Sequence, residues 1–277
     1  MYGVGEPLRG SNVSDFDQEK TTDLVEMLNA KSYRMWFGND MFEGWRWNAP
    51  LDEFVISTST KESYNKILSD LREAGVMEIT GMGHYLPVVP STVSDGMNYY
   101  VPVRGSEDYQ EFLDKIYEIW YQMALTFPQV DVWEIGNETN HTYIKYVDYT
   151  YVSYDELAAI NTDMLYYAFK AIKDANPKAK VITPGFAPVS SYHNSNTNNE
   201  NEDITKVDYG IDSIAIFLDK IYNNIKSGSY PYHNNSKYVN EYKTDPDYYF
   251  DGVAYHPYDI GTNSNSNQDL FCIHLHI

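Results

Sequence analysis

Short apolar runs alternate with longer amphipathic segments along most of the chain. The apolar runs have the length of strands, and the segments between them carry helical periodicity and capping signals such as Ser59-x-x-Glu62 and Ser153-x-x-Glu156. Such regular alternation predicts an α/β fold with a parallel sheet and right-handed crossovers. Strands are predicted near Val4 and at 32–37, 76–80, 130–135, 180–185 and 250–258, and helices at 17–30, 59–74, 106–127, 153–175 and 212–226.

The predicted helix at 17–30 carries a group of apolar residues that we place on its inner face. These residues are Leu24, Val25, Met27 and Leu28. Loop-like stretches follow the predicted strands at 39–50, 88–103, 140–151 and 190–209. Because such folds place their sites on the face where strands run into loops, we expect the functional residues there.

The composition sets the size of the fold and excludes some partners. The chain has 277 residues, enough for one large domain or two small ones, and we expect a single domain that spans 1–277. Its 20 basic and 40 acidic residues give a formal net charge of −20, which argues against nucleic acid and polyanionic substrates and fits a neutral ligand. No apolar run is long enough to span a membrane.

The single cysteine, Cys272, rules out an internal disulfide and leaves the compartment undecided. No signal peptide is visible at the start, from Met1 to Gly5, which reads as a strand. A secreted and a cytoplasmic location both stay open, with the balance toward secretion. The oligomeric state is not indicated.

The most particular stretch runs from Val130 to Asn140 and contains Trp-Glu-Ile-Gly-Asn-Glu. It begins as a buried strand and ends in Asn137-Glu138 where the strand meets a loop. A carboxyl group at the mouth of a strand, beside an amide and near aromatic rings, is well placed to donate a proton. An ordinary surface glutamate after a strand is the alternative, and the length of the run favours the catalytic interpretation.

This stretch resembles the acid/base motif of clan A glycoside hydrolases, which are retaining enzymes built on a (β/α)8 barrel. The resemblance is greatest to family 39 and its relatives, and less clear to family 5. It implies that Glu138 is the general acid/base and that Asn137 bonds the sugar 2-hydroxyl. The implied fold is an incomplete TIM barrel with about six of the eight βα units. The implied reaction is retaining hydrolysis of a neutral glycoside or polysaccharide, without metal or organic cofactor.

The same resemblance gives roles to residues on other predicted strands. Arg34 would lie where the clan has an arginine that bonds the nucleophile, and a charge inside a strand is costly unless it is paired. His256 and Tyr258 would match the clan's His-x-Tyr beside the nucleophile. His84 and Tyr85 would shape the subsite for the non-reducing sugar. His84 could instead be a structural residue, His-Pro-Tyr alone is a weak signal, and Arg34 could reach solvent.

Tryptophans and a short terminal pattern give further candidates. Trp36, Trp45 and Trp47 are candidate sugar platforms, with packing on the barrel as an equal alternative, whereas Trp133 is predicted in the core. Cys272, His274 and His276 alternate at strand period, but their spacing is not that of known zinc sites, so no metal site is predicted.

The resemblance breaks at the nucleophile. A retaining glycosidase needs two carboxylates about 5–5.5 Å apart, and the clan carries the second on a glutamate that closes strand seven. The last glutamate in the chain is Glu241, before the sixth predicted strand, so no residue matches. We therefore expect a truncated glycosidase barrel that is inactive unless a partner supplies the missing part.

Two other classes of protein stay open. A non-catalytic carbohydrate-binding barrel would keep the sugar site without the chemistry. A lyase or an aldolase, in which Asn137-Glu138 is coincidental, would be expected to carry a lysine or a metal cluster at the strand ends, and the sequence indicates neither.

Overall fold

The computed structural model of the chain describes nine stretches of sequence. These are residues 3–9, 15–45, 51–83, 99–140, 144–146, 152–187, 211–228, 236–256 and 273–275. The architecture below concerns these residues.

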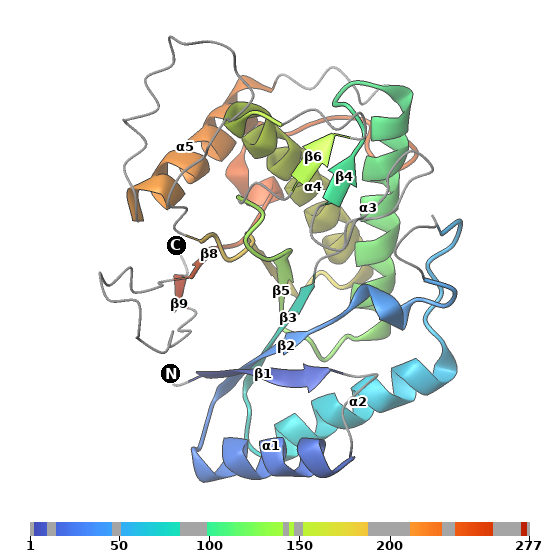
Figure 1. Cartoon of the computed structure of the whole chain (residues 1–277), viewed down its shortest axis with the longest axis vertical. Coiled ribbons are helices and arrows are strands. Elements are labelled where there is room, and N and C mark those ends of the chain that lie inside the picture. Colours follow the sequence, from blue (N-terminus) through green and yellow to red (C-terminus); the bar gives the residue numbers. More distant parts are fainter. Residues whose placement is uncertain are drawn as a thin grey trace.

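Five strands form one parallel sheet in the order β1-β2-β3-β5-β7 (Figure 1). Each strand pairs with the strand that precedes it in this series, so the row never reverses direction. Right-handed crossovers in a row that advances one way place every crossover helix on the same face, which is the arrangement of a barrel wall. The strands are Gly3–Arg9, Ser32–Trp36, Glu78–Gly83, Val132–Ile135 and Lys180–Ile182.

β8, at Val253–Tyr255, continues this row through isolated parallel bridges from Ile182 to Gly252 and from Phe186 to Tyr255. The described part of the chain thus contains six successive parallel strands of a barrel-like α/β fold. β9, at Ile273–Leu275, pairs antiparallel with β8 and so does not begin a further parallel βα unit.

Five α-helices connect the strands and lie around the outside of the row (Figure 1). They are α1 Asp15–Met27, α2 Thr58–Glu73, α3 Glu107–Thr126, α4 Tyr154–Ala175 and α5 Ile211–Ser227. The predicted cap of α4 is confirmed, since Ser153 accepts from the Glu156 amide at 3.2 Å. The predicted cap of α2 is wrong by two residues, because Ser57 rather than Ser59 accepts from the Thr60 amide at 3.0 Å.

The predicted inner face of the first helix is also wrong for three of its four residues. Val25 is fully buried, but Leu24, Met27 and Leu28 are more than half exposed. The helix ends at Met27, and Asn29 adopts a φ of 50°. That left-handed residue closes a Schellman motif, which turns the chain so that Val25 and Ala30 enter the core and the apolar residues between them stay outside.

A second, two-stranded parallel sheet lies beside α3 and α4 (Figure 1). It joins β4, at Tyr99–Val101, to β6, at Ile144–Tyr146. Both strands belong to segments that the sequence predicts as loops. Strands of three residues inside long connections carry too little periodicity to be recognised.

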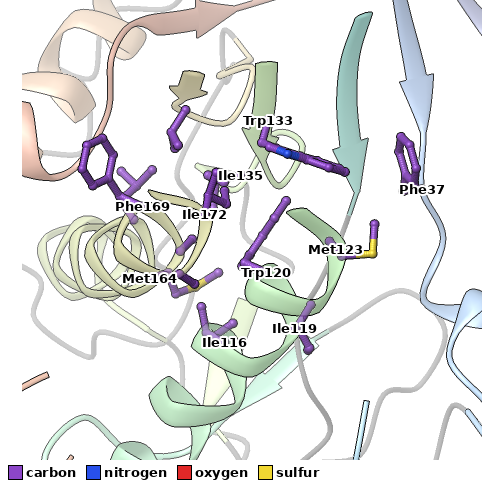
Figure 2. Packing of buried hydrophobic residues seen from close by; sticks show 14 of the residues in the cluster. Phe37, Ile116, Ile119, Trp120, Met123, Trp133, Ile135, Met164, Phe169 and Ile172 are labelled. Atoms are coloured by element: carbon purple, nitrogen blue, oxygen red, sulfur yellow. The ribbon is translucent and has the colours of Figure 1, made fainter. Parts of the chain in front are cut away.

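The main core fills the space between the sheet and the helices. Figure 2 shows Trp133 of β5 beside Trp120 of α3 and pointing toward Phe37, which follows β2; all three rings belong to the same core cluster. The ring centroids of Trp133 lie 5.9 Å from those of Trp120 and 5.1 Å from those of Phe37. Trp133 is fully buried, which confirms its predicted place in the core. A separate small cluster on the opposite face of the sheet contains Val132, Ile182 and Ala254.

An aspartate that bonds the neighbouring strand precedes both β5 and β8. Asp131, before β5, accepts from the amide of Ile79 in β3 and from the Arg72 guanidinium, at 2.7 and 2.6 Å. Asp251 repeats this before β8, where it accepts from the Val181 amide and the Lys173 ammonium group, both at 2.7 Å. Each aspartate therefore ties a strand to its neighbour, while a base on the helix that precedes that neighbour, Arg72 of α2 or Lys173 of α4, balances the charge.

Among the helices in the described stretches, none has the length and apolar character that crossing a bilayer requires.

Candidate active site

The two faces of β5 have different roles. Side chains alternate across a strand, so Trp133 and Ile135 face the helices while Val132 and Glu134 face the inner side of the sheet. The Glu134 side chain is 1% exposed. A carboxylate buried this deeply needs a charged partner and hydrogen bonds.

Arg34 of β2 is that partner. The alternating burial along β2 turns Tyr33 and Met35 toward the helices and leaves Arg34 on the inner side. Its Nε donates to Glu134 Oε2 at 2.7 Å and its Nη2 to Glu134 Oε1 at 2.9 Å. Nη2 also donates to Asn137 Oδ1 at 2.9 Å. Arg34 is therefore paired on the inner side of the sheet, and its carboxylate partner is Glu134, a residue that was not among the predicted site residues.

A tight turn follows β5 and presents Asn137 and Glu138. Gly136 has a φ of +92°, which glycine adopts without penalty, and Glu138 has a φ of +51°, which is unfavourable for a residue with a Cβ. Such strain persists only where the surroundings hold it, and it is concentrated at functional sites. Here the Glu138 amide donates to the Gly185 carbonyl at 3.1 Å.

Residues after the turn anchor it further. The Asn140 side chain donates to the Ala187 carbonyl at 2.7 Å and accepts from the Ala187 amide at 3.1 Å. The Thr139 hydroxyl is bonded to the Asn161 side chain of α4. Because all of these groups are buried, the turn that carries Glu138 is fixed to both β7 and α4.

Glu138 is joined to His256, which follows β8. The imidazole Nδ1 lies 2.8 Å from Glu138 Oε1, and the two side chains are 3% and 20% exposed. The His256 amide donates to the Phe186 carbonyl at 2.8 Å, so the backbone of this histidine is fixed to the end of β7. Glu138 thus has a defined orientation and remains in contact with solvent.

The site therefore brings together residues within or just after four strands that are far apart in sequence: β2, β5, β7 and β8. Arg34, Asn137, Glu138 and His256 lie together there: Arg34 binds Glu134 and Asn137, and His256 binds Glu138. The sequence did contain a signal for Glu134: this glutamate stands inside an otherwise apolar strand, and a charge buried there requires a partner.

Of the other candidates, some lie in the described residues and some do not. Trp36 ends β2 and is partly buried, and Trp45 packs against the main core, which favours packing as its role. Among the described residues, no three His, Cys, Asp or Glu side chains gather as a metal site would require. Several candidates lie outside the described residues: His84, Tyr85, Trp47, Tyr258, Cys272 and His276.

Comparison with known proteins gives structural matches only. No family model matches the chain, and no curated protein matches it. Its structural neighbours are clan A glycoside hydrolases. A family 39 enzyme from the gut symbiont Bacteroides cellulosilyticus WH2 is 18% identical with a TM-score of 0.42, over 66% of this chain and 31% of that one.

Two further matches have similar values. A Bacteroidetes-affiliated GH5 cellulase is 15% identical with a TM-score of 0.45, over 67% of this chain and 47% of that one. A family 1 β-glucosidase from Thermotoga maritima is 15% identical with a TM-score of 0.47, over 87% of this chain and 55% of that one. The chain thus spans less than two thirds of each of these structures.

Proposed function

We propose that the site at the end of β5 binds a neutral glycoside and that Glu138 is its general acid/base. The observation that carries this proposal is the fixed orientation of the Glu138 side chain. Its Oε1 lies 2.8 Å from His256 Nδ1, and the side chain is 20% exposed. A proton donor must be fixed in direction and still reach its substrate, and Glu138 meets both requirements.

Asn137 is the proposed partner of a sugar hydroxyl. Its Oδ1 accepts from Arg34, which determines the orientation of the amide and turns the NH₂ end into the donor for the substrate. Because Arg34 is itself held by Glu134, the amide is fixed before any ligand arrives. Such preorganisation lowers the entropic cost of binding.

In the proposed reaction Glu138 protonates the glycosidic oxygen as the bond to the anomeric carbon breaks. The resulting carboxylate then takes a proton from the water that attacks this carbon, which returns Glu138 to its acid form. His256 orients the carboxyl group through both states.

A retaining mechanism also needs a second carboxylate, which attacks the anomeric carbon. Glu134 is unsuited to attack a sugar, because its two oxygens are held by Arg34 and by the Gly185 amide and its side chain is 1% exposed. Within these 277 residues no glutamate stands where the clan has its nucleophile. We therefore propose that this segment binds glycosides and that their hydrolysis requires a second carboxylate from outside it.

The same observation favours a second candidate, a carbohydrate-binding barrel without catalysis. The substitution Glu138→Gln separates the two candidates. It keeps the shape of the side chain, so a purely binding role predicts little change in affinity and no turnover in either protein. The acid/base role predicts that any turnover of aryl glycosides falls by about 10²–10⁴.

The proposal is tested by calorimetric titration of the chain with a panel of neutral oligosaccharides, together with an assay on aryl glycosides. We expect binding that weakens at least about tenfold in Asn137→Ala and is unchanged in Lys66→Ala, a substitution on the exposed face of α2. Absence of binding to the whole panel would overturn the proposal. Turnover by this chain alone equal to that of an intact glycosidase would contradict the proposal that hydrolysis needs a carboxylate from outside it.

A further inference from the structure

Gly185, just after β7, contacts both charged pairs of the site through its backbone. Its amide donates to Glu134 Oε1 at 2.8 Å, and its carbonyl accepts from the Glu138 amide at 3.1 Å. An isolated parallel bridge also joins it to Asn137. A single peptide segment therefore holds the buried carboxylate that orients Arg34 and the turn that presents Glu138.

The space in front of Gly185 is occupied by the same two pairs. A Cβ at this position would lie 2.2 Å from His256 Nε2, 2.6 Å from His256 Cδ2 and 2.9 Å from Glu134 Oε1. Real Cβ atoms do not approach other atoms that closely. The His256 imidazole, which binds Glu138, and the Glu134 carboxylate, which binds Arg34, thus both occupy space that a side chain at position 185 would need.

The backbone conformation does not explain the glycine. Gly136, in the neighbouring turn, has a φ of +92°, whereas Gly185 lies outside the left-handed region, so an alanine there would have no backbone strain. The requirement for glycine at 185 is one of space alone. Its neighbour Phe186 turns into the core and is fully buried, so the chain tolerates a large side chain one residue later.

We propose that Gly185 is a positioning residue that couples the Arg34–Glu134 pair to the Glu138–His256 pair. This inference rests on the proposed function, because only a glycoside-handling site would use both pairs together. Because the two shortest distances are to the imidazole, a side chain at 185 must displace the imidazole from Glu138, and it also presses on the Glu134 carboxylate that binds Arg34. The direction of the proton donor and that of the sugar-binding amide are then lost together.

The test is Gly185→Ala, followed in the ligand-free protein by the ring ¹⁵N signals of His256, which report whether Nδ1 is bonded to the Glu138 carboxylate. We expect these signals to change, and the affinity for any neutral glycoside that the wild type binds to fall about tenfold or more. The control is Gly75→Ala, where a φ of +94° makes the substitution strained but distant from the site. It should lower the unfolding midpoint without changing the His256 signals.

A folded Gly185→Ala protein with unchanged His256 signals would overturn the inference. Because this readout needs no ligand, it separates failure of the Gly185 role from failure of glycoside binding. If Gly185→Ala does not fold, its effect is measured again in a His256→Ala background. There the main obstacle is removed, so the loss in urea midpoint should be smaller than in the wild type or the protein should fold again. An equal loss in both backgrounds would overturn the inference as well.

Discussion

At the scale of single residues, the Arg34–Glu134 pair explains why a charged residue sits inside each of two barrel strands. The side chains are 14% and 1% exposed and share two hydrogen bonds. A paired guanidinium and carboxylate compensate each other, but a single charge left in this position does not. The pair is therefore a condition of folding as well as a support for Asn137.

Replacement of Glu134 tests this. In Glu134→Gln the carboxylate charge is lost and the Arg34 guanidinium stays buried beside a neutral amide. We expect the free energy of unfolding to fall by about 3 kcal/mol, measured by urea denaturation. As a control, Lys66→Ala breaks an exposed pair with Asp70 and should change stability by less than about 1 kcal/mol. Equal effects of the two variants would contradict the structural role of the buried pair.

Sequence reasoning identified most of the residues that meet at the site, but not their contacts. Arg34, Asn137, Glu138 and His256 each stand where a predicted strand ends or carries an unexpected polar group, and parallel strands bring those positions together. The pairing was not predictable, because it depends on register. The alignment of Trp36 with Met82 and of Met82 with Glu134 sets how far Arg34 can reach, and no local pattern encodes this.

At the scale of elements, the aspartates before β5 and β8 act as links between neighbouring strands. Asp251 accepts from the Val181 amide and the Lys173 ammonium group, both at 2.7 Å. We expect Asp251→Ala to lower the free energy of unfolding by about 2 kcal/mol, because the Val181 amide loses its acceptor, and to speed hydrogen exchange at that amide. Asp251→Asn keeps an acceptor and should lose less. Similar losses in both variants would contradict the role of the hydrogen bond.

Buried tyrosines between α4 and the segment before β8 make the fold sensitive to alkali. Burial raises the pKa of Tyr166 and of Tyr167 to about 12. In the unfolded chain a tyrosine ionises near pH ~10, so above that pH the unfolded state loses protons that the folded state keeps. The stability contributed by these hydroxyls is thus complete below pH ~10 and is lost as the pH rises through about 12.

Tyr167→Phe removes one of these ionisations. The variant loses the bond from Gln110 at 2.9 Å at every pH, but its stability should decline by about 1 kcal/mol less than that of the wild type between pH ~8.5 and ~11. Urea midpoints at the two pH values measure the difference. Tyr248→Phe, at an exposed side chain, should follow the wild type. A parallel decline in Tyr167→Phe and the wild type would contradict the role of burial.

The order of the main elements was predictable, because each strand and helix in the series carries its own periodicity and stop signals. The exceptions have physical reasons. β4 and β6 are too short to show a pattern, and the face of α1 depends on where the helix ends. Asn29, with a φ of 50°, closes that helix before its apolar stripe is complete.

At the scale of the whole molecule, the outer face of α1 presents apolar surface to solvent. Leu24, Met27 and Leu28 are 51%, 73% and 58% exposed. β1, beside α1, pairs with β2 alone among the described strands. Exposed apolar residues, and a strand that has one neighbour among the described strands, favour association with other chains.

Replacing these three residues by glutamine should reduce self-association, measured by sedimentation velocity at increasing protein concentration. Stability should change little, by about 0.5 kcal/mol, because the side chains are not in the core. Val25→Gln, at the buried neighbour, should instead unfold the chain at lower urea concentration. A wild-type chain that stays monomeric at all concentrations would contradict this account of the face.

The central claim is that Asn137 and Glu138 form the contact point for a sugar. NMR signals of the Asn137 side-chain amide and of the Glu138 carboxyl carbon, followed during titration with a neutral glycoside, test it most directly. We predict saturable shifts at both groups and smaller ones at residues of α2, which lies away from the site. Unchanged signals from Asn137 and Glu138, while the glycoside binds elsewhere or not at all, would contradict the claim.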